Sequence, residues 1–175
     1  MQPLNPPIST SQQLNAADMG MLESDQKFLR FALGSEDRGM VSLEQIVEVI
    51  SLTSADILPV PEMPNCVLGI YNWRGKMLWL IDLNHLVDYP PLLPLDRQTP
   101  LMAMVIEIKG HSIGLVVEYV HDIELHDVQQ LQPATADVFP SRLLPFVAGY
   151  LPDSNGIVLN TQAIALCPLW QIHRA

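Results

Sequence analysis

The sequence predicts an all-β protein built from two small β-barrels. Many short apolar segments of strand length are separated by turn signals, which is typical of a barrel or a sandwich. These segments form two sets, divided near residue 95 by the proline-rich stretch 90–100. The stretch MLWLI, residues 77–81, is apolar at every position, as in a strand with both faces covered. We therefore expect this strand to lie between two packed bodies.

The N-terminal part of the chain has a different composition. Residues 1–26 are rich in Pro, Gln, Asn, Ser and Thr and lack periodicity, which predicts a disordered or weakly ordered tail with one helical turn near 18–23. Residues 27–175 are expected to form a single domain. The alternative to a solvated tail is a segment that docks on a partner through its apolar residues, which are Leu14, Met19, Met21 and Leu22.

The first set of strands follows this tail. The side chains of residues 28–33 alternate with a period of two, which predicts a half-buried strand. A polar turn over 34–39 is expected to end this strand. A short helical turn then leads into a β-branched strand around 46–50. The pair Arg74-Gly75 sits between two strand-like arms, 69–73 and 76–82, and predicts a tight hairpin in which the glycine has a positive φ.

The second set begins beyond the proline-rich connection. It has the same character of short apolar segments, with a Lys109-Gly110 turn and a turn that contains Pro, Asp, Ser, Asn and Gly. The predicted elements are strands at 101–108, 112–120, 122–125, 146–151 and 156–160 and a short closing helix within 161–170.

Charge excludes two classes of function. The chain has 9 Lys and Arg against 19 Asp and Glu, a net charge of −10. Nucleic-acid binding and binding to an anionic membrane both require a basic surface, so neither is expected. Charged residues are only 16%, compared with about 25% in an ordinary domain. Part of the surface should therefore be apolar, which indicates contacts with a protein or a ligand.

The remaining composition indicates a cytoplasmic protein. The N-terminus has neither a basic region nor an apolar core of a signal peptide, and no apolar run approaches the roughly 20 residues of a membrane span. Cys66 and Cys167 have no metal or redox spacing, so reduced, packed thiols are expected.

No enzyme motif is present. The sequence lacks a nucleophile elbow, a P-loop, a dinucleotide-binding glycine motif and a zinc-protease motif. His121 and His126 stand near Glu118, Asp122, Glu124 and Asp127, but alternation along a strand would make such ligands diverge. We therefore expect no metal or cofactor and interpret this region as an acidic edge. Two alternatives stay open: a small-molecule-binding β-barrel sensor, and an enzyme with Cys66 or a histidine as nucleophile.

Several segments together resemble the CheW-like domain, the adaptor domain of bacterial chemotaxis-type signalling arrays. They are FLRFALG, VEVI, GIYNWRGKMLWLIDL, SIGLVVEYVHDIELHDVQQLQP and FVAGYLP, in the order and spacing of that family from about residue 28 to the end. The most specific pattern is a glycine, an Asn, an Arg-Gly pair and an apolar run closing in Asp-Leu. Its residues here are Gly69, Asn72, Arg74, Gly75, Asp82 and Leu83.

The resemblance implies two intertwined, five-stranded SH3-like β-barrels with a few short helices and a shared core. It also implies a non-catalytic adaptor that couples the cytoplasmic tip of a methyl-accepting receptor to the regulatory domain of a CheA-type histidine kinase. The receptor would lie in the groove between the barrels, and the kinase would contact barrel ends.

The resemblance further implies a site. In the family, the arginine of this turn pairs with a glutamate of a preceding strand, so Arg74 should pair with Glu48. A guanidinium suits a carboxylate in charge and geometry. Trp73 and Trp79 depart from the family pattern and suggest a specialised array, for instance one controlling type IV pilus motility or phototaxis. The residues expected in the receptor groove are Ile46, Glu48, Asn72, Trp73, Arg74, Gly75 and Met102.

Overall fold

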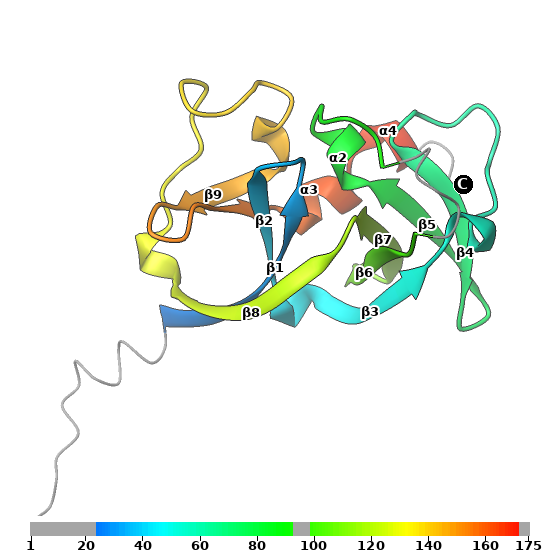
Figure 1. Ribbon diagram of the computed structural model, residues 1–175, viewed down its shortest axis with the longest axis horizontal. Coiled ribbons are helices and arrows are strands. Elements are labelled where there is room, and N and C mark those ends of the chain that lie inside the picture. The colour runs from blue at the N-terminus through cyan, green and yellow to red at the C-terminus, as the bar shows by residue number, and fades with distance from the viewer. Residues whose placement is uncertain (1–23, 93–98, 172–175) are drawn as a thin grey trace, which may run out of the picture.

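The computed structural model describes residues 24–92 and 99–171, and it confirms the all-β class (Figure 1). The strands of these residues are β1 (Asp25–Leu33), β2 (Asp37–Ser42), β3 (Ile46–Leu52), β4 (Val67–Trp73), β5 (Lys76–Asp82), β6 (Leu101–Ile108), β7 (His111–Val117), β8 (Val120–Asp127), β9 (Val147–Leu151) and β10 (Gly156–Leu159). The helices are short: η1 (Leu43–Gln45), η2 (Ser54–Asp56), α2 (Leu83–Leu86), η3 (Val128–Gln130), η4 (Leu144–Phe146), α3 (Thr161–Ala165) and α4 (Pro168–Gln171). No helix in the described ranges is long and apolar enough to cross a membrane.

The strands form two five-stranded sheets with the same pattern of neighbours. The first sheet has the order β8-β1-β2-β10-β9 and the second β3-β6-β7-β5-β4. In each sheet two antiparallel pairings are followed by one parallel pairing and a last antiparallel one. The two five-stranded units expected from the sequence are therefore present and have equivalent topologies.

The boundary between the sheets does not fall near residue 95. The second sheet is built from one continuous stretch, β3 to β7, whereas the first combines β1 and β2 with β8, β9 and β10. The expected division placed β1 with β3 and β7 with β8. That division followed the order of the strands along the chain. Sheet membership is instead decided by long-range pairing, of β1 with β8 and of β2 with β10.

The first strand begins inside the expected tail. Asp25 and Gln26 belong to β1 and lie opposite Asp127 and His126 of β8. Their backbone groups find partners on a strand distant in sequence, which the local composition does not reveal. The rest of the expected tail, with its helical turn near 18–23, lies outside the described residues.

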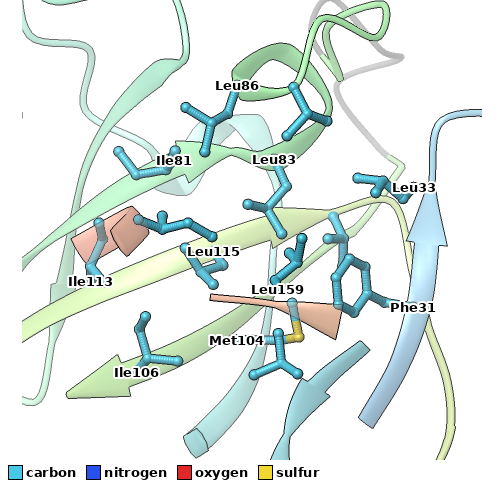
Figure 2. Close-up of a cluster of buried hydrophobic side chains, with 14 of the residues drawn as sticks. Phe31, Leu33, Ile81, Leu83, Leu86, Met104, Ile106, Ile113, Leu115 and Leu159 are labelled. Atoms are coloured by element: carbon cyan, nitrogen blue, oxygen red, sulfur yellow. The ribbon is translucent and has the colours of Figure 1, made fainter. Parts of the chain in front are cut away.

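The main core lies between the two sheets. Phe31 and Leu159 of the first sheet and Ile81, Met104 and Leu115 of the second belong to one buried cluster (Figure 2). The opposite face of the second sheet encloses its own smaller core, to which β6 contributes the alternate residues Leu101, Ala103 and Val105. Strand β6 is therefore covered on both faces, and the shared cluster joins both sheets into one folded body.

Strand β5 is doubly covered only in its second half. Leu78 and Leu80 point into the core of the second sheet, and Ile81 belongs to the cluster between the sheets. Met77 is 72% exposed, and Trp79 is partly buried, contrary to the expectation that all of MLWLI is enclosed. The face of β5 that carries Met77, Trp79 and Ile81 is therefore buried only at its Ile81 end.

The first turn is shorter than expected. The polar stretch 34–39 was predicted to be a turn, but β2 already begins at Asp37 and includes Gly39. A Cβ at position 39 would lie 2.2 Å from the Phe31 ring, so the glycine is needed for packing and not for a turn.

Candidate partner-binding site at the β4–β5 hairpin

The β4–β5 hairpin has the tight turn expected from the sequence. Arg74 and Gly75 have φ values of 51° and 78°, as in the two-residue turns that suit the twist of a hairpin. The Asn72 side-chain oxygen accepts a hydrogen bond from the Gly75 N–H at 3.1 Å. Asn72 therefore stabilises the turn that holds Arg74 at the tip.

Glu48 joins two neighbours at this tip. Its Oε2 lies 2.9 Å from Nη2 of Arg74, which confirms the expected ion pair. The same oxygen accepts a hydrogen bond of 2.8 Å from the Trp73 indole nitrogen. The Arg74 guanidinium also lies 5.2 Å from the centre of the Trp73 ring, within range of a cation–π contact. The family resemblance implied the ion pair, but the contacts of Trp73 require the tertiary fold.

These contacts bridge the two ends of the second sheet. Strands β3 and β4 are its two outermost strands, and Glu48 belongs to β3 while Trp73 belongs to β4. The shared carboxylate therefore helps to close the sheet into a barrel. The Arg74 side chain remains 64% exposed and that of Glu48 34% exposed, so both are accessible to a partner.

Trp73 is a core residue and does not form an open surface beside a groove. It is 7% exposed and packs in the core of the second sheet with Leu78 and Leu101. Its ring therefore contributes little to the surface at the hairpin tip. Alternation along β4 directs the side chain inward, and only its indole nitrogen reaches Glu48.

Ile46 and Met102 lie apart from the cluster at the tip. A register shift between Ile46 and Glu48 interrupts the alternation of β3, so that Ile46 packs against the core between the sheets. Met102 also packs against that core, opposite Ser51 near the far end of β3. The structure therefore groups Glu48 with four of the expected site residues, which are Asn72, Trp73, Arg74 and Gly75.

Asp82, which closes the sequence motif, has a structural role. The residue is fully buried, and its carboxylate accepts backbone hydrogen bonds from His85 at 3.0 Å and from Leu92 at 2.8 Å. Burial raises the pKa of this carboxyl group, and the two N–H groups oppose that effect. Asp82 caps α2 and fixes the chain that follows, so it is not available to a partner.

Strand β8 turns two of its apolar side chains outward. Ile123 and Leu125 are 56% and 59% exposed, whereas Glu124 and His126 are partly buried. Glu124 pairs with Arg30 of the neighbouring strand, and its second oxygen lies 2.7 Å from Nε2 of His126. Burial would raise the pKa of Glu124, but the His126 hydrogen bond and the Arg30 charge bring it below its usual value.

This inverted pattern was missed by sequence reasoning. Alternation in β8 was visible, but an alternating strand normally directs its apolar face toward the core. The one available signal was Arg30, a charge within the otherwise apolar stretch of β1. A further exposed apolar residue, Val47, stands at the register shift in β3 and is 49% exposed.

The candidate metal-binding and nucleophilic residues do not come together in one site within the described residues. His121 contacts the Tyr119 ring, whereas His126 contacts Glu124, and no group of three potential metal ligands forms within the described part of the chain. Burial raises the pKa of the Cys66 thiol to about 11. A thiol with that pKa is almost entirely protonated at neutral pH and is a poor nucleophile.

Comparisons with known proteins agree on one family. Residues 27–166 match the family model of the CheW-like domain. The chemotaxis protein CheW of Rhizobium meliloti (strain 1021) is 27% identical over 143 residues, which cover 82% of this chain and 88% of the relative. A probable chemotaxis protein CheW of Rhizobium etli is likewise 27% identical over 144 residues, with the same coverage. The crystal structure of the scaffolding protein TtCheW from Thermoanaerobacter tengcongensis has a similar fold. Its TM-score is 0.64 at 24% identity, over 77% of this chain and 88% of that one.

Proposed function

Since this chain belongs to the CheW-like domain family, we propose that it is a non-catalytic adaptor of a bacterial chemotaxis-type array. It couples the cytoplasmic tip of a methyl-accepting receptor to a CheA-type histidine kinase. The curated relatives named above are chemotaxis proteins, and the structural neighbour is a scaffolding protein, which supports this role.

The observation that carries the proposal is the Glu48–Arg74 pair at the hairpin tip. Arg74 is held in place by the turn, by Glu48 and by the Trp73 ring, yet most of its side chain is exposed. A guanidinium fixed in this way is suited to recognition, because less conformational freedom is lost when a partner binds. We therefore assign Arg74 and Glu48 to the receptor contact.

Exposed apolar side chains supply the remaining contact area. Val47 on β3 and Ile123 and Leu125 on β8 are each about half exposed or more, and both strands lie along the same lower side of the molecule in Figure 1. A helical receptor tip binds by laying an apolar face on such a surface. We therefore propose that the receptor contact extends from the hairpin tip toward β8.

The kinase contact uses a barrel end. The regulatory domain of a CheA-type kinase is itself CheW-like, so both partners present comparable strand ends and turns. Because the two sheets of this chain have equivalent strand orders, either barrel offers such an end. The adaptor acts in the cytoplasm and joins the membrane only through its receptor.

A specialised array, controlling type IV pilus motility or phototaxis, stays a prediction. Trp73 no longer supports it, because that residue is buried. Trp79 remains a departure from the family pattern that reaches the surface.

The alternative, a small-molecule sensor, has less support. The core of the second barrel is filled by its own side chains, among which Leu78, Leu80 and Val105 are fully buried. The hollow beside Met77 has a volume of about 250 Å³ and that beside Tyr89 about 240 Å³. Both are smaller than the roughly 300–1,000 Å³ of small-molecule pockets.

The proposal is tested by capture from the native cell lysate with the full-length chain, followed by mass spectrometry. We expect a methyl-accepting receptor and a CheA-type kinase among the proteins retained. The R74E variant should lose the receptor and keep the kinase. The matched control is R142E, because Arg142 forms a comparable exposed pair with Asp88 at 2.6 Å on another part of the surface. R142E should retain both partners.

A charge exchange sharpens the test. E48R and R74E should each weaken receptor binding, and the double variant E48R/R74E should recover part of it, if the pair acts as a unit. If both single variants capture the receptor normally, the assignment of Glu48 and Arg74 to the receptor contact is wrong. If the wild type captures neither partner, the proposed adaptor function itself is wrong.

A further inference from the structure

A hollow separates the two hairpin tips of the second sheet. Its lining residues come from β5 and from the β6–β7 turn and β7, and they are Lys76, Met77, Trp79, Gly110, His111 and Ser112. The hollow has a volume of about 250 Å³. Strands β5 and β7 run parallel, with Trp79 opposite Ile113, so Met77 and His111 occupy corresponding places two residues earlier. The hollow is therefore built on regular, hydrogen-bonded backbone and not on a loose loop.

Two lining residues of this hollow, Met77 and Trp79, lie on the face of β5 that farther along the strand forms the core between the sheets. Ile81 on that face and Ile113 on β7 are buried, whereas Met77 is 72% exposed and Trp79 is partly buried. The exposed Met77 beside Trp79 offers an apolar contact to a partner. Met77 is also flexible enough to adjust to an incoming side chain.

The rim of the hollow is basic on a strongly acidic protein. Of the nine Lys and Arg residues in the chain, Arg74, Lys76 and Lys109 stand on these two hairpins, while the net charge is −10. Arg74 is paired with Glu48. Glu107, on β6, is not among the residues that line the hollow, and none of the ion pairs among the described residues involves Lys76 or Lys109. Lys76 and Lys109 are therefore available to an acidic partner.

The parallel pairing of β5 with β7 begins only at Trp79 and Ile113, so the backbones of residues 76–78 and 111–112 are not paired with each other at the hollow. Its side chains suit an apolar group beside Met77 and Trp79 and carboxylates at the two lysines. We propose that this hollow is a docking site for an acidic segment of a partner protein, which inserts an apolar side chain between Met77 and Trp79.

This site is additional to the receptor contact assigned to Glu48 and Arg74, and its test does not depend on that assignment. The probe is a synthetic peptide, Ac-EELLDEFEE-NH2, titrated into the isotope-labelled full-length chain and followed by backbone amide NMR shifts. The comparison peptide has every Glu and Asp replaced by Lys. We expect shifts centred on residues 76–79 and 109–112, with the acidic peptide only.

Charge and apolar contact are separated by variants. K76E/K109E should weaken binding about tenfold, since two attractive charges become repulsive. M77S should weaken binding about threefold or more while the dependence on salt is kept. The matched control K27E reverses an exposed lysine on β1, in the other sheet, and should bind as the wild type does. Thermal unfolding of each variant verifies that it is folded.

Several results would overturn the proposal. They are the absence of amide shifts with the acidic peptide at millimolar concentration, equal binding of the lysine peptide, and an equal loss of binding in K27E. Shifts centred on Glu48 and Arg74 alone would place the peptide at the receptor contact and leave the hollow without a ligand.

Discussion

The indole nitrogen of Trp73 lies 2.8 Å from Oε2 of Glu48, and this contact joins the two outermost strands of the second sheet. The tryptophan is buried, whereas the carboxylate also holds the exposed guanidinium of Arg74. One acidic side chain therefore serves both the closure of a barrel and the presentation of a charge at the surface. The two roles can be separated by mutation.

Removal of the Glu48 carboxylate should destabilise the fold more than removal of its surface partner. E48A leaves the buried indole N–H of Trp73 without its acceptor, which should lower the free energy of unfolding by about 1–3 kcal/mol. R74A removes only an exposed ion pair and should cost less than about 1 kcal/mol. Urea denaturation measures both. Equal losses in the two variants would contradict the assigned roles.

Acid should weaken the attachment of β8. The pKa of Glu124 is below its ordinary value in the folded chain, so the folded state favours the ionised form. Its contribution is present above the unfolded pKa of roughly 4.3–4.5 and is lost as the pH falls through the folded value. We expect the free energy of unfolding to fall from about pH 5 to pH 3, and E124Q to flatten this dependence.

The control for this prediction is E36Q, on the exposed turn between β1 and β2. It should keep the pH dependence of the wild type. Urea midpoints measured at half-unit pH intervals provide the comparison, and an unchanged slope in E124Q would show that other carboxyl groups cause the acid sensitivity.

Gly39 should tolerate no added methyl group while Phe31 is present. The Cβ of G39A would lie 2.2 Å from the Phe31 ring, which is fully buried, so overpacking should cost about 1–3 kcal/mol. F31L alone should also destabilise the protein, because it leaves a cavity. The double variant F31L/G39A should lose less stability than the two single losses combined. Additive losses in chemical denaturation would argue against the contact.

The Cys66 thiol should be unreactive in the folded protein. With its pKa raised to about 11 by burial, the thiolate fraction at pH 8 is roughly 100-fold below that of an unfolded cysteine. In a C167S background, iodoacetamide should label Cys66 slowly in buffer and rapidly in urea. Fast labelling of the folded chain would indicate an accessible thiolate and would revive the nucleophile hypothesis.

Local chemistry was readable from the sequence by itself. The pairs Arg74-Gly75 and Lys109-Gly110 each specify a two-residue turn, since glycine adopts a positive φ without strain, and both turns have the expected geometry. Short apolar segments between such turns specified the all-β class. The resemblance to the CheW-like domain added the Glu48–Arg74 pair, because a motif fixes which residues meet even when they are distant in the chain.

Tertiary structure alone decided which side of each strand is covered. Alternation separates the two faces of a strand but does not say which of them meets the core. Met77 is therefore exposed although its whole segment is apolar, and Ile123 points outward while Glu124 points inward. Sheet membership also depends on the fold, because β1 pairs with β8 across most of the chain. Because those pairings join residues far apart in the sequence, no local pattern of residues predicts which strand will cover a given face.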